Sequence, residues 1–247
     1  MLKALVLMLQ FLTRIPINIK IDMNKETLGK GTFFFPFIGM MIGGIASVVY
    51  YGLGFVNNDI ASLGAVFTII AVTGGLHLDG LSDTADGFFS SRKRERILEI
   101  MKDSRVGVFG VVFIIFDILF KYVIIKEMNV HTAIIAIVLS CGIGRVSAST
   151  LFTFGKSARK DGLGNMFVGN DSKKYFFAAL VIFLAIGIYV SNIVFIIAIV
   201  SSISFTLLFM KYSYKIIGGL TGDVYGAACE LSEIISLFVF LGASMWI

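Results

Sequence analysis

Long apolar stretches, separated by short polar segments, run along almost the whole chain. A helix of about 20 apolar residues crosses the hydrocarbon core of a bilayer, because every backbone N–H and C=O is then bonded within the segment. The pattern therefore predicts an all-α, polytopic membrane bundle of about seven transmembrane helices, at residues 31–56, 60–78, 106–125, 130–152, 175–190, 193–210 and 224–247.

Three features leave the number of spans between six and eight. The polar pair Ser191-Asn192 either separates two spans or kinks one long helix, and the last span carries Glu230 and Glu233. Residues 1–12 are apolar but too short to cross, and no small-residue cleavage site follows them. We expect these residues to form an interfacial or re-entrant helix that the mature protein retains.

Composition supports a membrane protein, because 57% of the residues are hydrophobic and only 15% are charged. No internal repeat and no low-complexity tail is visible, so residues 1–247 are predicted to form one membrane-embedded domain. The missing repeat argues against a transporter built from inverted repeats. Cys141 and Cys229 lie in predicted spans without metal-ligand spacing, which predicts buried thiols and neither a disulfide nor a zinc site.

Basic residues predict the topology. If the N-terminus is cytoplasmic, all 21 Lys and Arg residues except Lys121 and Lys126 fall on the cytoplasmic side, as the positive-inside rule requires. We therefore expect a multi-pass protein of the cytoplasmic (inner) cell membrane, with its active site facing the cytoplasm. The same bias accounts for the net charge of +5, so the charge gives no reason to expect a nucleic-acid partner.

The strongest chemical signal is the stretch GGLHLDGLSDTADG at 74–87, which contains Asp79, Asp83 and Asp86. On a helix, positions i, i+4 and i+7 lie within roughly 60° of one another, so these carboxylates share one face, which Ser90 at i+11 extends. Like charges held together repel unless a cation lies between them, and oxygen ligands suit Mg²⁺. The cluster thus predicts a Mg²⁺ site for a pyrophosphate-activated substrate. The alternative is that the carboxylates only solvate a helix end at the interface.

Residues on either side of this cluster are weaker candidates. His77 points to the opposite face of the same helix, which favours a packed, hydrogen-bonded histidine over a general base. Residues 90–105 are typical of a short surface helix with Ser91 as its N-cap. Asp103 and Arg105 lie at the turn into the third span, where they either complete a metal and phosphate site or join the solvated surface.

Two features within the spans carry charge. Asp117 and Lys121 are spaced i, i+4, so we interpret them as a pair that neutralises itself. Arg145 has no partner at helical spacing, so we expect it to face a polar cavity and to contact a phosphate.

Two later inner loops combine glycines with polar residues. The loop at 160–165 ends in Asn165, and the loop at 218–226 contains Thr221 and Asp223. Glycines let a backbone approach a bulky ligand closely. Each loop is weak evidence alone and stronger if both converge with the aspartate cluster.

Six segments in the same order resemble the cobalamin synthase family, the adenosylcobinamide-GDP ribazoletransferases, and the resemblance runs nearly from end to end. They are FLTRIP at 11–16, FPFIG at 35–39, the stretch at 74–87, EIMKDSRVG at 99–107, GLG at 162–164 and GLTGDVYG at 219–226. No acidic position of the family pattern is lost.

The resemblance implies a Mg²⁺-dependent transfer. The ribose 3′-hydroxyl of α-ribazole, or of its 5′-phosphate, is expected to attack the cobinamide-side phosphorus of adenosylcobinamide-GDP, so that GMP leaves and adenosylcobalamin or its 5′-phosphate forms. One aspartate or His77 would accept the hydroxyl proton. The expected phosphate-binding or substrate-binding residues are Asp103, Arg105, Arg145, Asn165, Thr221 and Asp223. The oligomeric state stays open, and a homo-oligomer is compatible with the apolar faces.

Three other functions remain as alternatives. CDP-alcohol phosphotransferases use aligned aspartates but carry an Ala-Arg pair where this chain has Leu81-Ser82. UbiA-type prenyltransferases usually have two separated aspartate motifs with other spacings. A cation-coupled transporter predicts acids near the bilayer midplane, whereas this cluster lies at a span edge.

Overall fold

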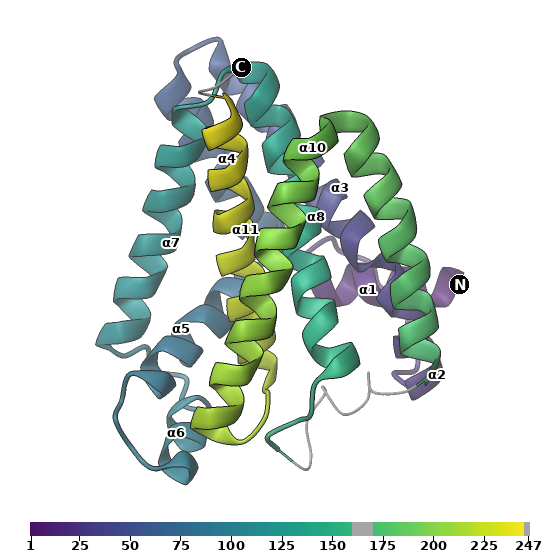
Figure 1. Cartoon of the computed structure of the whole chain (residues 1–247), viewed down its shortest axis with the longest axis vertical. Coiled ribbons are helices and arrows are strands. Elements are labelled where there is room, and N and C mark those ends of the chain that lie inside the picture. The colour runs from purple at the N-terminus through teal and green to yellow at the C-terminus, as the bar shows by residue number, and fades with distance from the viewer. Residues whose placement is uncertain (160–169, 245–247) are drawn as a thin grey trace.

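The computed structural model describes residues 1–159 and 170–244, and the regular secondary structure of these residues is helix, apart from one isolated bridge between Ser157 and Leu220. The helices are α1 (Leu2–Leu12), α2 (Lys25–Gly31), the 3₁₀ turn η1 (Thr32–Phe34), α3 (Phe35–Gly54), α4 (Asn58–Thr73), α5 (Leu76–Phe88), α6 (Arg94–Ile100), α7 (Val108–Lys126), α8 (Val130–Phe154), α10 (Asn170–Ile217) and α11 (Gly222–Ser244) (Figure 1). The predicted all-α class is confirmed.

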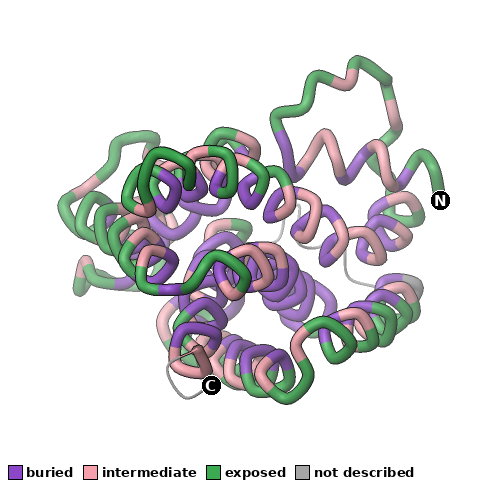
Figure 2. The backbone as a smooth tube through the Cα atoms, turned by 90° about the horizontal axis from the view of Figure 1, so that it is seen from above, coloured by how far each residue is buried: buried purple, intermediate pink, exposed green. Residues whose placement is uncertain are grey.

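Helix α8 forms the centre of the bundle. Every residue from 139 to 153 is buried, and α3, α10 and α11 pack around it, as the buried central helices in Figure 2 show.

An asparagine side chain caps the N-terminus of α4 and of α8. The side chain of Asn57 accepts a hydrogen bond from the Ile60 N–H at the start of α4, and Asn129 does the same for Thr132 in α8.

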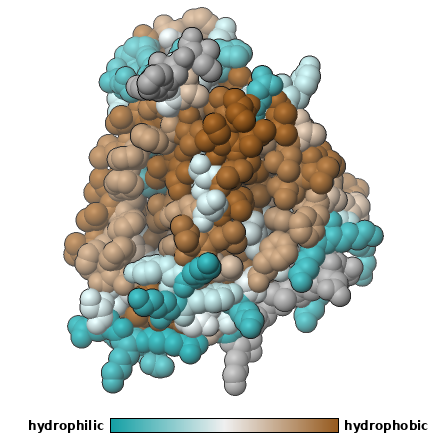
Figure 3. Space-filling view, viewed as in Figure 1, coloured by the Kyte–Doolittle hydropathy of each residue, from teal (hydrophilic) through white to brown (hydrophobic). Residues whose placement is uncertain are grey.

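The outer helices expose apolar side chains. Val108 on α7 is 78% exposed and Val181 on α10 is 65% exposed, which is unfavourable in water and favourable against lipid. Figure 3 shows a broad apolar band across the middle of the molecule, with hydrophilic residues gathered at its two ends. The protein is therefore a multi-pass membrane protein.

Among the described residues, five helices are long and apolar enough to cross a membrane, and a sixth span results if α4 and α5 count as one broken span. Helix α10 loses helical geometry at Ser191 and Asn192. Its two limbs turn back on each other there and diverge away from the bend (Figure 1), and near the bend the ring centroids of Phe183 and Phe195 are 5.3 Å apart. The chain thus forms a hairpin there and not one kinked helix. The total of seven spans and the cytoplasmic N-terminus stay predictions.

The predicted span at 60–78 ends earlier than expected. Helix α4 stops at Thr73, because Gly74 and Gly75 both adopt left-handed backbone conformations with φ of 65° and 71°. The chain then bends by 90° into α5. The aspartate stretch therefore occupies a short helix of its own after this bend.

Candidate functional site

The three predicted carboxylates lie on α5. Because Leu76–Phe88 is helical, Asp79, Asp83 and Asp86 project from one face as predicted. Asp79 is exposed, and Asp83 and Asp86 are half-buried. Ser90 does not extend this face, because α5 ends at Phe88 and the Ser90 hydroxyl donates to the Gly87 carbonyl oxygen at 2.7 Å.

Helix α5 crosses α11 where each helix has a glycine. A Cβ at Gly80 would lie 2.7 Å from the carbonyl oxygen of Asp223, and a Cβ at Gly226 would lie 3.0 Å from that of His77. Only glycine allows two backbones to approach this closely. The crossing brings the first turn of α11 to the acidic face of α5.

Asp223 joins the carboxylates as a consequence. It interacts electrostatically with Asp79 and Asp83, and its Oδ2 accepts a hydrogen bond from the Thr221 hydroxyl at 3.1 Å. Thr221 Oγ1 also accepts from the Val224 N–H at 3.4 Å, as an N-cap of α11 does. The structure therefore brings the predicted residues Thr221 and Asp223 to the aspartates of α5.

Arg159 is a member of this site that sequence reasoning did not select. Its Nη2 lies 3.6 Å from Asp223 Oδ2, and it also interacts electrostatically with Asp83. The Ser157–Leu220 bridge fixes it there, since the Ala158 N–H donates to the Leu220 carbonyl oxygen at 2.8 Å. No local motif marks Arg159. The only signal in the sequence is its position three residues before the glycine-rich segment at 162–164.

Asp86 has a different environment from its two neighbours on α5. Its Oδ2 accepts the Gly107 N–H at 2.6 Å and its Oδ1 accepts the Gly110 N–H at 2.9 Å. Both donors belong to the start of α7, where backbone N–H groups have no partner within the helix. Asp86 therefore anchors α7 to α5, in addition to any role toward a metal.

Asp103 and Arg105 lie in the loop between α6 and α7 and bind each other. Arg105 Nη2 donates to Asp103 Oδ2 at 2.6 Å, and the same guanidinium and the Arg105 backbone N–H both donate to Oδ1. These hydrogen bonds lower the pKa of Asp103 to about 2. The pair is a solvated surface feature in this arrangement. The preceding helix starts at Arg94, so Ser91 is not its N-cap.

The Arg145 side chain does not reach the surface of the protein. It is fully buried in the bundle, where it pairs with Glu233 and donates to the Cys141 carbonyl oxygen at 3.2 Å. A partner from α11 neutralises the guanidinium in this arrangement, and the expected phosphate contact stays a prediction. His77 is buried as predicted, with its Nδ1 3.5 Å from Arg145 Nη2.

The predicted Asp117–Lys121 pair is confirmed at 3.2 Å, and it belongs to a larger buried group. Lys121 also pairs with Glu230 and, at 2.8 Å, with Glu233. Because Glu233 contacts Arg145 as well, this group joins α7, α8 and α11 inside the bundle.

The donor set of the site fits a hard divalent cation. Asp79, Asp83 and Asp223 supply only carboxylate oxygens, and their like charges oppose one another. Within the described ranges, no three His, Cys, Asp or Glu side chains converge closely enough to ligate an ion. Asp79 and Asp83 are one helical turn apart, so rotamer changes can bring their oxygens together without moving the backbone.

The predicted substrate-binding residue Asn165 lies outside the described residues.

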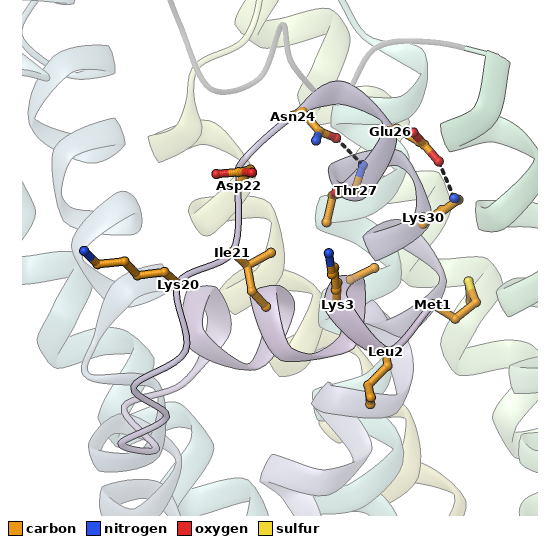
Figure 4. Close-up of a pocket in the computed structure, with 11 residues that line it drawn as sticks. Met1, Leu2, Lys3, Lys20, Ile21, Asp22, Asn24, Glu26, Thr27 and Lys30 are labelled. Atoms are coloured by element: carbon orange, nitrogen blue, oxygen red, sulfur yellow. Dashed lines mark hydrogen bonds and ion pairs between the residues drawn. The ribbon is translucent and has the colours of Figure 1, made fainter.

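A cavity of about 230 Å³ opens beside these carboxylates, and its lining includes Asp79, Asp223 and several aromatic side chains. A larger cavity of about 630 Å³ lies between α1 and α2 (Figure 4). Among its lining residues, the Asn24 side chain accepts a hydrogen bond from the Thr27 N–H, and Glu26 forms an ion pair with Lys30. This cavity shares no lining residue with the smaller cavity. We therefore place the candidate site at the smaller one.

The chain is similar to known proteins over nearly its whole length. The family model for cobalamin-5-phosphate synthase matches residues 4–241. The adenosylcobinamide-GDP ribazoletransferase of Clostridium novyi (strain NT) is 39% identical over 242 residues, which cover 97% of each chain. That of Clostridium botulinum (strain 657 / Type Ba4) is 43% identical over 97% of this chain and 98% of its own, and that of Thermoanaerobacter sp. (strain X514) is 36% identical over 99% of each. No solved structure matches the chain.

Proposed function

Because the chain belongs to the cobalamin-5-phosphate synthase family, we propose that it is an adenosylcobinamide-GDP ribazoletransferase. Its substrates are adenosylcobinamide-GDP and α-ribazole or α-ribazole 5′-phosphate, and its products are adenosylcobalamin or the corresponding 5′-phosphate and GMP. The observation that carries the assignment to this site is the meeting of the carboxylates of α5 and α11 beside Arg159, where Asp79 and Asp223 line a cavity.

The proposed reaction is one phosphoryl substitution. The 3′-oxygen of the ribose bonds to the cobinamide-side phosphorus, and the bond from that phosphorus to the bridging oxygen breaks. The bridging oxygen leaves with GMP, and the hydroxyl proton passes to a carboxylate of the site. Substitution of this kind depends mainly on positioning and on stabilising charge at the phosphoryl oxygens.

The residues of the site divide these tasks in our proposal. Asp79 and Asp83, with Asp86 or Asp223, hold Mg²⁺, which when bound neutralises charge on the diphosphate and on the departing GMP. Arg159 lies next to the same carboxylates, and we assign its guanidinium to a phosphate oxygen of the substrate because a guanidinium pairs well with phosphate. Mg²⁺ and the Arg159 guanidinium would both offset the negative charge of the diphosphate.

We further propose that this site faces the cytoplasm from the inner cell membrane. The polar loops on its side of the bundle, including residues 90–105, are rich in Arg and Lys. Basic loops resist translocation, so the nucleotide substrate reaches the site from the side on which nucleotides are made.

A direct assay tests this function. Purified protein in detergent is given adenosylcobinamide-GDP, α-ribazole and Mg²⁺, and GMP and the joined cobamide are measured by liquid chromatography. We expect equal amounts of both products, none without α-ribazole, and loss of turnover with a chelator that added Mg²⁺ restores. Release of CMP from a CDP-activated alcohol, without GMP release from adenosylcobinamide-GDP, would instead favour a CDP-alcohol phosphotransferase.

A further inference from the structure

Four helices contribute an aromatic side chain to the small cavity beside the carboxylates. Phe11 comes from α1, Phe35 from α3, Phe152 from α8 and Tyr225 from α11. Phe35 and Phe152 meet edge to face with ring centroids 4.9 Å apart, and Phe152 and Tyr225 do so at 5.8 Å. The cavity therefore has a continuous aromatic wall, which is a surface suited to a flat apolar ring.

The same cavity also has polar lining. Asp79 and Asp223 line it, together with three glycines that have no side chain, Gly80, Gly222 and Gly226. Two of these glycines form the close crossing of α5 and α11. A ligand with one apolar end and one end rich in hydroxyl groups therefore finds aromatic rings for the first and carboxylate oxygens for the second in the same cavity.

We infer that this cavity binds the acceptor substrate, with its benzimidazole ring against the aromatic wall and its ribose at Asp79 and Asp223. The inference rests on the proposed function and names the subsite of that reaction. The volume of about 230 Å³ is below the roughly 300–1,000 Å³ of pockets that enclose whole drug-sized ligands. It suits one ring system and excludes the corrinoid macrocycle.

The other flat ring of the reaction, guanine, fits this wall poorly. Guanine carries donors and acceptors around its edge, and burying them against phenylalanine rings would leave them without partners. The benzo edge of a benzimidazole has no polar atom. Its ribose hydroxyls meet carboxylate oxygens, which accept hydrogen bonds and hold the attacking hydroxyl beside the acidic face of α5.

Ala148 offers a test, because it is a small, buried residue of α8 that lines the cavity. Ala148→Val narrows the space for the ring. We expect it to lower kcat/KM for α-ribazole, whose base carries two methyl groups, about 10-fold or more relative to the riboside of unsubstituted benzimidazole, since a pocket discriminates single methyl or methylene groups by roughly 10–200-fold. The KM for adenosylcobinamide-GDP should stay within twofold of the wild-type value.

The matched control is Ala136→Val, the same change at a fully buried position of α8 that does not line the cavity. The ratio of kcat/KM for two acceptors does not depend on the fraction of folded enzyme, so partial misfolding does not obscure the result. A ratio equal to that of the wild type and of Ala136→Val, or a rise in the KM of the GDP substrate alone, would overturn the inference. Absence of GMP release by the wild type with either acceptor would reject the proposed function itself.

Discussion

Asp83 lies at the centre of the acidic group, where Asp79, Asp86 and Asp223 all act on it and Arg159 partly offsets them. Such crowding of negative charge opposes folding, and a bound cation offsets it. We expect Asp83→Asn to lower kcat by about 10²–10³-fold, as loss of one charge-stabilising group does in other enzymes. The thermal unfolding midpoint in detergent should stay the same or rise. A variant with wild-type turnover would exclude Asp83 from the site.

Asp86 allows the contrasting prediction, because both of its oxygens bind backbone N–H groups of α7. Asp86→Asn keeps one acceptor and places an amide donor against an N–H, so it should destabilise the protein by about 0.5–2 kcal/mol, the range for losing a helix cap. For a chain of this size, that corresponds to roughly 2–4 °C per kcal/mol in the unfolding midpoint. If activity fell while the midpoint stayed unchanged, Asp86 would be a ligand and not an anchor.

At the scale of single residues, the sequence predicted the features that follow from the geometry of one helix. The shared face of Asp79, Asp83 and Asp86 and the pairing of Asp117 with Lys121 depend on spacing along one helix. The partners of Asp86 and Arg145, and the presence of Arg159 beside Asp223, depend on contacts between distant segments. No local pattern encodes such contacts, so the sequence indicated neither the buried partner of Arg145 nor the place of Arg159 in the site.

At the scale of elements, the crossing of α5 and α11 holds the site together. A Cβ at Gly80 would overlap the backbone of Asp223, and a backbone contact cannot relax as a side chain does. We expect Gly80→Ala to separate the helices and to lower kcat by at least about 10-fold, because small displacements of reacting groups are costly. Gly52→Ala on α3 is the matched control, since a Cβ there meets nothing within 4 Å. Equal activity of the two variants would show that the crossing tolerates a methyl group.

The spans were predicted more accurately than the breaks between them. The bounds of α7 and α8 agree with the predicted ranges 106–125 and 130–152 within two residues, because uninterrupted apolar length is a strong local signal. The 90° bend after α4 was not predicted. Gly74-Gly75 was noted as part of the acidic stretch, yet a glycine pair inside an apolar span is equally compatible with a continuous helix, and only the left-handed conformation of both residues makes it a turn.

At the scale of the whole molecule, the buried ion pairs connect three helices in the bundle interior. Glu233 of α11 binds Lys121 of α7 at 2.8 Å and also pairs with Arg145 of α8. We expect Glu233→Gln to destabilise the protein by about 3–5 kcal/mol, the cost of leaving a buried charge without its partner. Glu127→Gln, at an exposed position, should change the free energy of unfolding by less than about 0.5 kcal/mol. Similar midpoints for the two variants would mean that Glu230 and Asp117 compensate for the lost charge.

The orientation of the molecule in the membrane can be measured at the two ends of α7. Ser104 precedes this helix, Glu127 follows it, and both are exposed, while 19 residues at about 1.5 Å each separate their sides by nearly the thickness of a bilayer. Both native cysteines, Cys141 and Cys229, are buried and should not react. In intact cells, a membrane-impermeant maleimide should label Glu127→Cys and leave Ser104→Cys unlabelled until the cells are opened. The reverse pattern would place the carboxylates of α5 outside the cytoplasm, away from the supply of GDP-activated substrate, and would contradict both the topology and the proposed site of reaction.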